Sequence, residues 1–225
     1  MKSGVVALTR RLKKLYVPII SDTLDEMGLT RNTLAPEIRP LLPRIRIAGQ
    51  ALTAKTEWYP EFTKIEMADW IRVMLKMLEA SKPQDIFVVS TGGNIKAAAW
   101  GELMSNAAQF RGAEAAVLDG AVRDVPRILS MKKPFQVFAK GINPADSKGR
   151  LRYAEYNITV ECGGVKVDPG DMIFGDHDGV VCIPRTDAVT VVERSEEKLT
   201  KEDSFRRAVR RGMGVSGAFA KYKTF

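Results

Sequence analysis

The chain has 225 residues, of which 45% are hydrophobic and 28% charged, the composition of an ordinary soluble globular protein with a full core. No stretch approaches the roughly 20 apolar residues of a membrane span, and the N-terminus becomes charged too early for a secretory signal. We therefore expect a cytoplasmic protein that does not bind a membrane. The formal net charge of +8 favours anionic partners.

The basic residues gather in two segments, 10–14 near the start and 206–211 near the end. Neither segment is interleaved with the aromatic side chains that stack on bases. We therefore expect a solvated basic surface, which attracts small anionic substrates, and no nucleic-acid partner.

The first part of the chain predicts two helices and a strand. Residues 21–28 begin with an N-cap type residue and end in glycine, as short helices do. Residues 44–55 alternate in the manner of a strand. Residues 61–80 carry apolar side chains at helical spacing, and Pro83 prevents this helix from continuing.

The middle of the chain predicts a strand–helix–strand–helix passage. Residues 86–89 and 115–118 are apolar runs typical of buried strands, and residues 95–109 and 125–130 are predicted to be helical. Such an order implies parallel pairing with a right-handed crossover. The pair Asp119-Gly120 is predicted to form the turn that ends the second strand.

The second half is rich in predicted strands, at residues 135–139, 158–161 and 179–184. Pro169-Gly170 lies between two further apolar runs and predicts a tight turn between strands. The whole pattern predicts the α/β class.

A long helix is predicted over residues 186–211. Acidic residues precede basic ones by four positions, the favourable order on an exposed helix face, in the pairs Glu197/Lys201, Glu202/Arg206 and Asp203/Arg207. No internal repeat and no linker rich in Pro, Gly or Ser divides the chain, so we expect a single domain over residues 1–225.

Charged residues concentrate at one predicted helix start and one predicted strand end. Arg123 and Asp124 follow the buried run 115–118, and Glu102 follows Gly101. A guanidinium binds carboxylates and a carboxylate suits a hard divalent cation, so Arg123 and Asp124 together can bind an anion and a metal.

Whether main-chain amides join this site depends on where the helix begins. If a new helix opens at Gly101-Glu102, the amides of Leu103 and Met104 are free to receive a carboxylate. If one helix continues from Ile95, those amides are already used.

Several common site types lack support. His177 is the only histidine and no Gly-x-Ser-x-Gly elbow exists, which argues against a serine hydrolase. Cys162 and Cys182 lack the spacing of a metal pair and are predicted to be buried free thiols, so a zinc site is not expected. No glycine-rich nucleotide-binding loop is present either.

Two weaker alternatives remain open at this stage. Residues 90–94 follow a predicted strand and precede a predicted helix, so they form either a plain turn or an anion-binding loop. Lys96 is the nearest candidate for a Schiff-base lysine, although exposed lysines are the norm in a chain this basic.

Taken together, several ordered blocks of the chain resemble the family that contains 4-hydroxy-4-methyl-2-oxoglutarate aldolase and the regulator of ribonuclease activity A. The blocks lie at residues 21–25, 48–53, 101–107, 119–124 and 169–184, and the resemblance spans about residues 17–211.

The resemblance implies a compact α-β-β-α sandwich of the swivelling-domain type, with mixed sheets and a long C-terminal helix. It also implies assembly as a homotrimer or homohexamer with sites between subunits. Its aldolase members are class II enzymes, in which Mg²⁺ or Mn²⁺ binds a pyruvate-like 2-oxo acid and stabilises the enolate, and many also decarboxylate oxaloacetate.

The resemblance also implies residue roles. Asp124 would bind the metal directly, Glu102 would bind it through water, and Arg123 would bind the carboxylate and oxo end of the substrate. The loop at Gly101, with the amides of Leu103 and Met104, would hold the same carboxylate, and Glu202 of a neighbouring subunit is the best counterpart of a further water-mediated metal ligand.

The family also contains non-catalytic regulators that bind a ribonuclease, and this is the second reading of the chain. That branch is generally acidic and lacks the full set of metal ligands, whereas this chain is basic and keeps Glu102 and Asp124. The segment 57–62 and the residues after Gly212 depart from the family pattern, which bears on the substrate more than on the metal.

Overall fold

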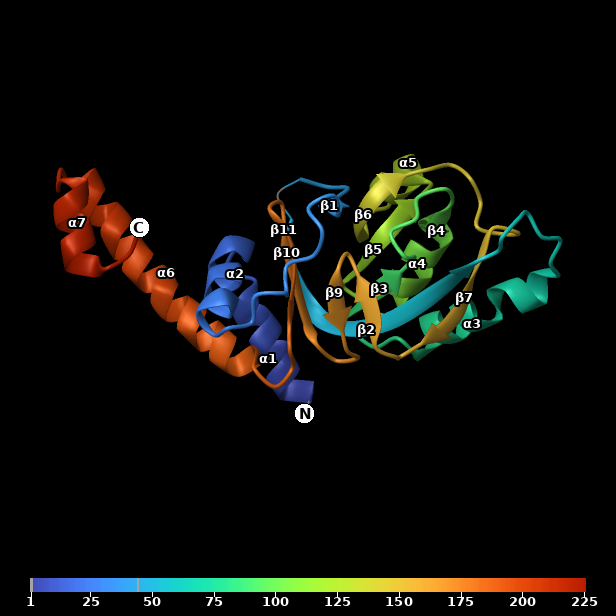
Figure 1. Cartoon of the computed structure of the whole chain (residues 1–225), viewed down its shortest axis with the longest axis horizontal. Helices are drawn as coiled ribbons and strands as arrows, with labels where there is room; N and C mark the ends of the chain where they lie inside the picture. Colours follow the sequence, from blue (N-terminus) through green and yellow to red (C-terminus); the bar gives the residue numbers. More distant parts are fainter. Residues whose placement is uncertain (1, 44) are drawn as a thin grey trace.

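A mixed β-sheet forms the centre of the molecule in a computed structural model that describes residues 2–43 and 45–225 (Figure 1). The described residues form a nine-stranded sheet in the order β1-β6-β5-β3-β2-β10-β11, to which β4 adds beside β5 and β7 beside β2. The strands are β1 (Arg39–Pro40), β2 (Ile47–Trp58), β3 (Asp85–Ser90), β4 (Ala98–Trp100), β5 (Ala115–Val122), β6 (Gln136–Ile142), β7 (Leu151–Tyr156), β10 (Met172–Asp176) and β11 (Gly179–Ile183). A separate hairpin pairs β8 (Val160–Cys162) with β9 (Val165–Val167).

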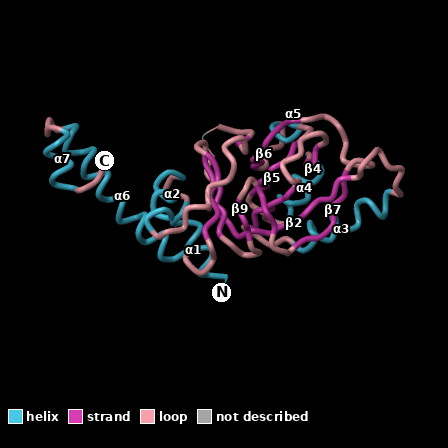
Figure 2. Tube along the Cα trace, in the orientation of Figure 1, coloured by secondary structure: helices cyan, strands magenta, loops and turns pink. Residues whose placement is uncertain are grey.

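Helices cover the sheet at both ends of the molecule (Figure 2). They are α1 (Lys2–Leu12), α2 (Val17–Glu26), α3 (Met67–Ala80), α4 (Glu102–Phe110), α5 (Val125–Leu129), α6 (Ala188–Arg210) and α7 (Val215–Tyr222). One apolar cluster joins α3, α4 and α5 to strands β2 to β7, and another joins α1, α2 and α6 to the β10–β11 hairpin. The outer half of α6 and α7 project away from the sheet (Figure 1).

Strand β5 lies deepest in the sheet. Each of its residues is buried, and it pairs in parallel with β3 on one side and β6 on the other. A parallel strand covered on both faces needs a continuous apolar run, which the residues 115–118 supply. The predicted α/β class with mixed strands and a long C-terminal helix is confirmed, as is the predicted parallel pairing.

Asp119-Gly120 does not form the predicted turn. Both residues belong to β5, which continues to Val122. The Asp119 carboxylate accepts hydrogen bonds from the main-chain N–H and the hydroxyl of Thr91, so its burial is compensated inside the sheet. A β-carbon at position 120 would lie 2.6 Å from the Thr91 side chain, which explains the glycine there without a turn.

The predicted helix over 95–109 is wrong in its first part. Residues 98–100 form β4, which pairs with the end of β5, and α4 begins only at Glu102. Contacts with β5 and with Ala145 determine this geometry, since Ala98 N–H donates to the Ala145 carbonyl at 3.0 Å. Such long-range pairing overrides the local helical pattern.

Other predicted elements are confirmed with shifted ends. The helix expected at 21–28 begins earlier, as α2, and the helix expected at 61–80 begins only at Met67. Strand β2 covers the predicted strand from Ile47 onward, while the predicted start at Arg44 lies outside the described residues. None of the described helices has both the length and the apolar character that a membrane crossing requires.

The two cysteines are free and buried, as expected. Burial raises the pKa of both thiols far above the ordinary value, and the nearby carboxylates of Asp119 and Asp171 add to the effect at Cys162 and Cys182 respectively. Both residues therefore pack in the core as neutral thiols.

Candidate active site

The N-terminus of α4 forms one wall of the candidate site. Gly101 is the N-cap residue in an extended conformation, and it has no side chain that could cap the helix. The N–H groups of a first helical turn have no partner within the helix, so those of Leu103 and Met104 are available to a ligand. The structure thus favours the new helix at Glu102 over a continuous helix from Ile95.

The Arg123-Asp124 pair lies directly after β5 and forms the opposite wall. Arg123 N–H donates to the Trp100 carbonyl at 3.0 Å, which fixes the end of β5 against β4. Asp124 has a φ of 59°, in the left-handed region that Asp tolerates better than most residues, and it begins α5. The Arg123 hydrogen bond and the Asp124 backbone conformation set the directions in which the two side chains leave the strand.

Asp124 joins the two walls. Its Oδ2 accepts a hydrogen bond from Glu102 N–H at 3.3 Å. A β-carbon at position 101 would lie 2.8 Å from the same oxygen, so only glycine leaves room for the carboxylate there. The turn at Gly101 and the end of β5 are therefore matched to each other.

The Arg123 guanidinium lies between two carboxylates. Its Nε is 3.8 Å from Asp124 Oδ2, and its Nη2 is 3.3 Å from Asp146 Oδ1. The three side chains are 34%, 42% and 41% exposed, so these ion pairs contribute little to folding stability. Their effect is to hold a partly exposed guanidinium in one orientation.

Asp146 is a further acidic residue beside Arg123 that no motif in the sequence predicts. It lies in the loop after β6, whose carboxyl end is next to that of its parallel neighbour β5. Ligand-binding residues gather at the carboxyl ends of parallel strands, so the position of Asp146 after the predicted strand 135–139 was the available signal.

Glu102 lies at the mouth of the site. Its Oε1 accepts a hydrogen bond from the Asn106 side chain at 2.5 Å, one turn further along α4. Leu103 is 80% exposed beside it, whereas Met104 is buried in the core and anchors the helix. The structure thus places Gly101, Glu102, Leu103, Met104, Arg123 and Asp124 close together, and their roles in binding a metal or a substrate stay predictions.

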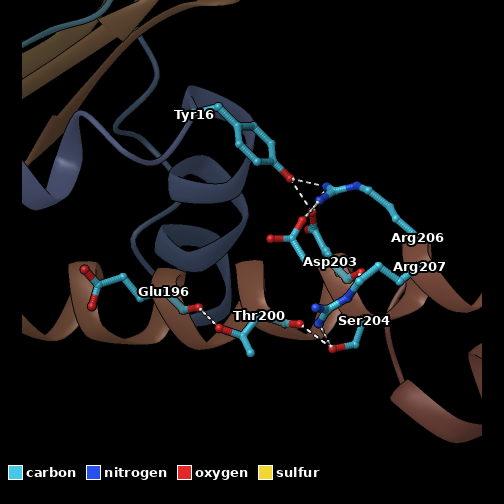
Figure 3. Close-up of polar contacts among 8 residues, drawn as sticks. Tyr16, Glu196, Thr200, Asp203, Ser204, Arg206 and Arg207 are labelled. Atoms are coloured by element: carbon cyan, nitrogen blue, oxygen red, sulfur yellow. Dashed lines mark hydrogen bonds and ion pairs between the residues drawn. The ribbon is translucent and has the colours of Figure 1, made fainter.

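Glu202 is not part of this group within one chain. It lies on the outer half of α6, at the end of the molecule opposite α4 and α5 (Figure 1). Its carboxylate accepts hydrogen bonds from the Tyr16 hydroxyl and from Arg206. Tyr16 and Arg206 meet above α6 (Figure 3). Burial and the hydrogen bond to Glu202 raise the pKa of Tyr16. Glu202 could reach a site of this kind only in another copy of the chain.

The predicted pairing along α6 is correct for Glu202 with Arg206. Asp203 instead pairs with Arg206, at 2.6 Å, while the Arg207 guanidinium donates to the Asp203 main-chain carbonyl and to Ser204. The shorter spacing of three residues therefore competes with the spacing of four on this face.

The loop at residues 90–94 is not open to an external anion. Thr91 N–H and Gly93 N–H donate to the Asp119 carboxylate at 2.6 and 3.1 Å. The turn reading of this segment is therefore correct. Lys96 is exposed, and nothing buries it in the apolar surroundings that activate a Schiff-base lysine.

The residues that could hold a metal are the carboxylates of Asp124, Glu102 and Asp146. Their oxygen donors suit Mg²⁺ or Mn²⁺, which often bind proteins through one or two carboxylates and keep several waters. Over residues 2–43 and 45–225, no group of three or more His, Cys, Asp or Glu side chains is arranged to hold a metal alone. The donor set therefore fits a metal bound mainly by Asp124, with water or a neighbouring subunit completing its coordination.

Comparison with known proteins shows to which family the chain belongs. The family model described as RraA-like: Aldolase/RraA matches residues 17–182. The chain belongs to the Aldolase/RraA family.

Relatives of the chain carry three kinds of name: aldolase, uncharacterized protein and ribonuclease inhibitor. A Halalkalibacterium halodurans protein named "Putative 4-hydroxy-4-methyl-2-oxoglutarate aldolase" is 30% identical over 93% of this chain and 91% of its own. The uncharacterized protein MJ0644 of Methanocaldococcus jannaschii is 35% identical over 79% of this chain and 80% of its own. The crystal structure of Streptomyces coelicolor RraAS2, described as an unusual member of the RNase ES inhibitor RraA family, is 25% identical with a TM-score of 0.80, covering 89% of this chain and 97% of that one.

Proposed function

We propose that this member of the Aldolase/RraA family is a divalent-metal-dependent carbon–carbon lyase. Its substrate would be a small 4-hydroxy-2-oxo acid, cleaved through a pyruvate enolate, or oxaloacetate, which it would decarboxylate. The observation that carries the proposal is the arrangement of Asp124, with Arg123 beside it, against the N-terminus of α4. The aldolase names of relatives support the same activity.

Arg123 and the first turn of α4 supply the hydrogen-bond donors that would bind the substrate. Arg123 lies beside Asp124, and Glu102 N–H at the start of α4 donates to the same carboxylate, so a 2-oxo carboxylate bound next to Asp124 would be near both the guanidinium and the N–H groups of Leu103 and Met104. These donors are held by β5 and α4 before any ligand binds, so they need little rearrangement during the reaction.

Charge stabilisation is the main catalytic task. Cleavage leaves an electron pair on the pyruvate carbon skeleton, and Arg123 lies where it can neutralise the resulting negative charge. A divalent metal, when bound by Asp124 with Glu102 acting through water, would supply Lewis-acid polarisation of the 2-oxo group. The Gly101 turn keeps the space between α4 and Asp124 free for this arrangement.

The test is a coupled assay of pyruvate release with Mg²⁺ or Mn²⁺, with and without a chelator. Wild-type turnover should require the metal, and Arg123→Ala should lower the rate by about 10²-fold or more, as removal of a preorganised charge does elsewhere. Arg127→Ala is the matched control, because Arg127 is an exposed arginine of the adjacent helix α5. Absence of turnover on every 4-hydroxy-2-oxo acid and on oxaloacetate would refute the proposal.

The second candidate function is regulation of a ribonuclease through protein binding, which the name of the Streptomyces relative supports. Capture of a ribonuclease by this chain, unchanged by Asp124→Ala and without lyase activity of the wild type, would favour that function. Lyase activity that is present in the wild type and lost in Asp124→Ala would favour the enzyme.

A further inference from the structure

We propose that a pocket between α6 and α7, lined by Ser204, Arg207, Ala208, Arg211 and Tyr222, binds a small anion of the phosphate class. The anion would be free phosphate or the phosphoryl group of a small metabolite. The pocket lies where α6 and α7 project away from the sheet, at the end of the chain opposite the candidate active site (Figure 1). The inference therefore does not depend on the lyase function proposed above.

The first observation is the charge of the C-terminal segment. Residues 204–225 contain four arginines and two lysines, and they contain no aspartate or glutamate. These basic side chains supply most of the net charge of +8. A segment with positive charge alone attracts anions from solution.

The second observation is the size and lining of the α6–α7 pocket. Its volume is about 240 Å³, and two arginines, a serine and a tyrosine line it together with one alanine. Among the described residues, no acidic side chain lines it. Pockets for drug-sized ligands have volumes of about 300–1,000 Å³. The α6–α7 pocket is smaller, and its polar lining suits one small charged group.

The fold of the segment holds the pocket in shape. Gly212, with a φ of 92°, ends α6 and lets the chain reverse. Ala208 of α6 and Ala218 of α7 are buried, and the two helices pack against each other. Phe205 and Phe225 meet edge to face with ring centres 5.9 Å apart, which brings the end of the chain back to α6. The lining residues are thus in place before an anion binds.

The third observation is that Arg207 is oriented by neutral partners. Its Nε donates to the Asp203 carbonyl and its Nη2 to the Ser204 hydroxyl, each at 3.2 Å (Figure 3). The Ser204 hydroxyl donates in turn to the Thr200 carbonyl at 2.9 Å. These bonds fix the guanidinium and leave its remaining N–H groups available to an anion.

Within residues 2–43 and 45–225, neither Arg207 nor Arg211 forms an ion pair with a carboxylate. The ion pairs of this part of α6 belong to Arg206, which contacts Glu202 and Asp203. Like charges four residues apart on a helix repel each other. An oxyanion bound between the two guanidiniums would relieve this repulsion, and a guanidinium can bind phosphate through paired hydrogen bonds.

Capping of α6 does not account for these arginines. Basic side chains near a helix C-terminus can bind its last carbonyl groups. Here main-chain N–H groups bind them instead. Arg211 N–H and Met213 N–H both donate to the Ala208 carbonyl at 3.1 Å, and Gly212 N–H donates to the Val209 carbonyl at 2.9 Å.

The test is titration calorimetry with inorganic phosphate and, separately, with methyl phosphate, in a chloride buffer of low ionic strength. The wild type should bind at least one of them. Arg207→Gln/Arg211→Gln should weaken this binding by at least about tenfold, because hydrogen bonds between charged groups are the strong ones. Arg72→Gln/Arg194→Gln is the matched control, since it removes the same charge at exposed positions of α3 and α6 and should bind as the wild type does.

Two further variants locate the anion and test the geometry of the pocket. Phosphate could also bind Arg123, so the titration is repeated with Arg123→Ala, in which binding at the α6–α7 pocket should persist. Arg207→Lys/Arg211→Lys keeps the charge but loses the planar guanidinium groups, so its affinity should also fall. Loss of all binding in Arg123→Ala, or wild-type affinity in the lysine variant, would overturn the inference.

The remaining outcomes are equally decisive. Tighter binding of methyl phosphate would assign the pocket to a phosphorylated metabolite, and tighter binding of inorganic phosphate would assign it to the free ion. Either result supports the inference. A wild type that binds neither, or a control variant that loses as much affinity as Arg207→Gln/Arg211→Gln, would overturn it. A single-stranded RNA oligonucleotide that binds far more tightly than both small anions would also overturn it, in favour of a nucleic-acid surface.

Discussion

At the scale of single residues, the geometry of the site depends on the absence of a side chain at Gly101. A β-carbon at position 101 would lie 2.8 Å from Asp124 Oδ2, a distance that β-carbons essentially never show. The start of α4 is held by hydrogen bonds from Ser105 N–H and the Ser105 hydroxyl to the Gly101 carbonyl, whereas the Asp124 carboxylate is 42% exposed, so the carboxylate and not the helix start would have to shift.

Gly101→Ala should therefore lower lyase activity by at least about tenfold, since a shift of about one ångström in a catalytic group is enough for such losses. The free energy of unfolding should change little, because the displaced carboxylate is 42% exposed. Activity and urea unfolding would be measured together. Gly214→Ala serves as the control, because a β-carbon there would meet nothing within 4 Å. Wild-type activity in Gly101→Ala would contradict the predicted close approach.

The sequence singled out charged residues that the structure places close together, whereas it predicted the segments around them less well, and the roles of those residues stay predictions. Arg123, Asp124 and Glu102 were recognisable because their chemistry is local and charged. Asp146 was missed because its approach to Arg123 depends on the pairing of β5 with β6, which no short motif encodes. The prediction of a turn at Asp119-Gly120 failed for the same reason. The N–H groups that compensate the Asp119 carboxylate belong to Thr91 and Gly93, which lie 28 and 26 residues earlier in the chain.

At the scale of elements, α1 and α6 are joined by an arginine–carboxylate pair with two parallel hydrogen bonds. Arg11 Nε and Nη2 donate to Glu196 at 2.9 and 2.7 Å. The hydrogen bond from Arg11 lowers the pKa of the Glu196 carboxyl below its ordinary value of 4.5. A carboxyl group whose pKa is lowered by folding stabilises the folded state above its unfolded pKa, and this contribution is lost as the pH falls through the folded pKa.

Glu196→Gln should consequently reduce the free energy of unfolding near pH 7 by less than about 1 kcal/mol, because both side chains are more than one third exposed. The difference from wild type should shrink as the pH falls below 4.5. Urea unfolding at several pH values measures it, with Glu197→Gln as the neighbouring control. A difference that grows toward acid pH would contradict the assigned ion pair.

A second prediction at this scale concerns the junction of β3, β4 and β5. Asp119 is buried and accepts hydrogen bonds from Thr91 and from Gly93 N–H. Asp119→Ala would leave these donors without their acceptor, at a cost of about 2–4 kcal/mol in the free energy of unfolding. Denaturant unfolding checks this value, and Asp178→Ala, at an exposed position, provides the control. A loss below about 1 kcal/mol would show that water replaces the carboxylate.

At the scale of the whole molecule, the candidate site and Glu202 lie at opposite ends of one chain (Figure 1). We propose that a neighbouring copy completes the site, as homotrimers or homohexamers would allow. Specific activity should then fall when the protein is diluted below the concentration at which the oligomer dissociates. Parallel light-scattering and pyruvate-release measurements over a dilution series test this, and constant activity in a proven monomer would contradict it.

The burial of Asp119 also affects which compounds can bind at the loop after β3. A glycine-containing loop after a strand can bind a phosphoryl group through its N–H groups. In the loop after β3, the N–H groups of Thr91 and Gly93 donate to the Asp119 carboxylate instead. An incoming anion would meet the like charge of Asp119 there, and the N–H groups of Thr91 and Gly93 are already used. Phosphate esters and oxo acids alike are thereby disfavoured at this loop, which leaves anion binding at this edge of the sheet to Arg123 and the start of α4.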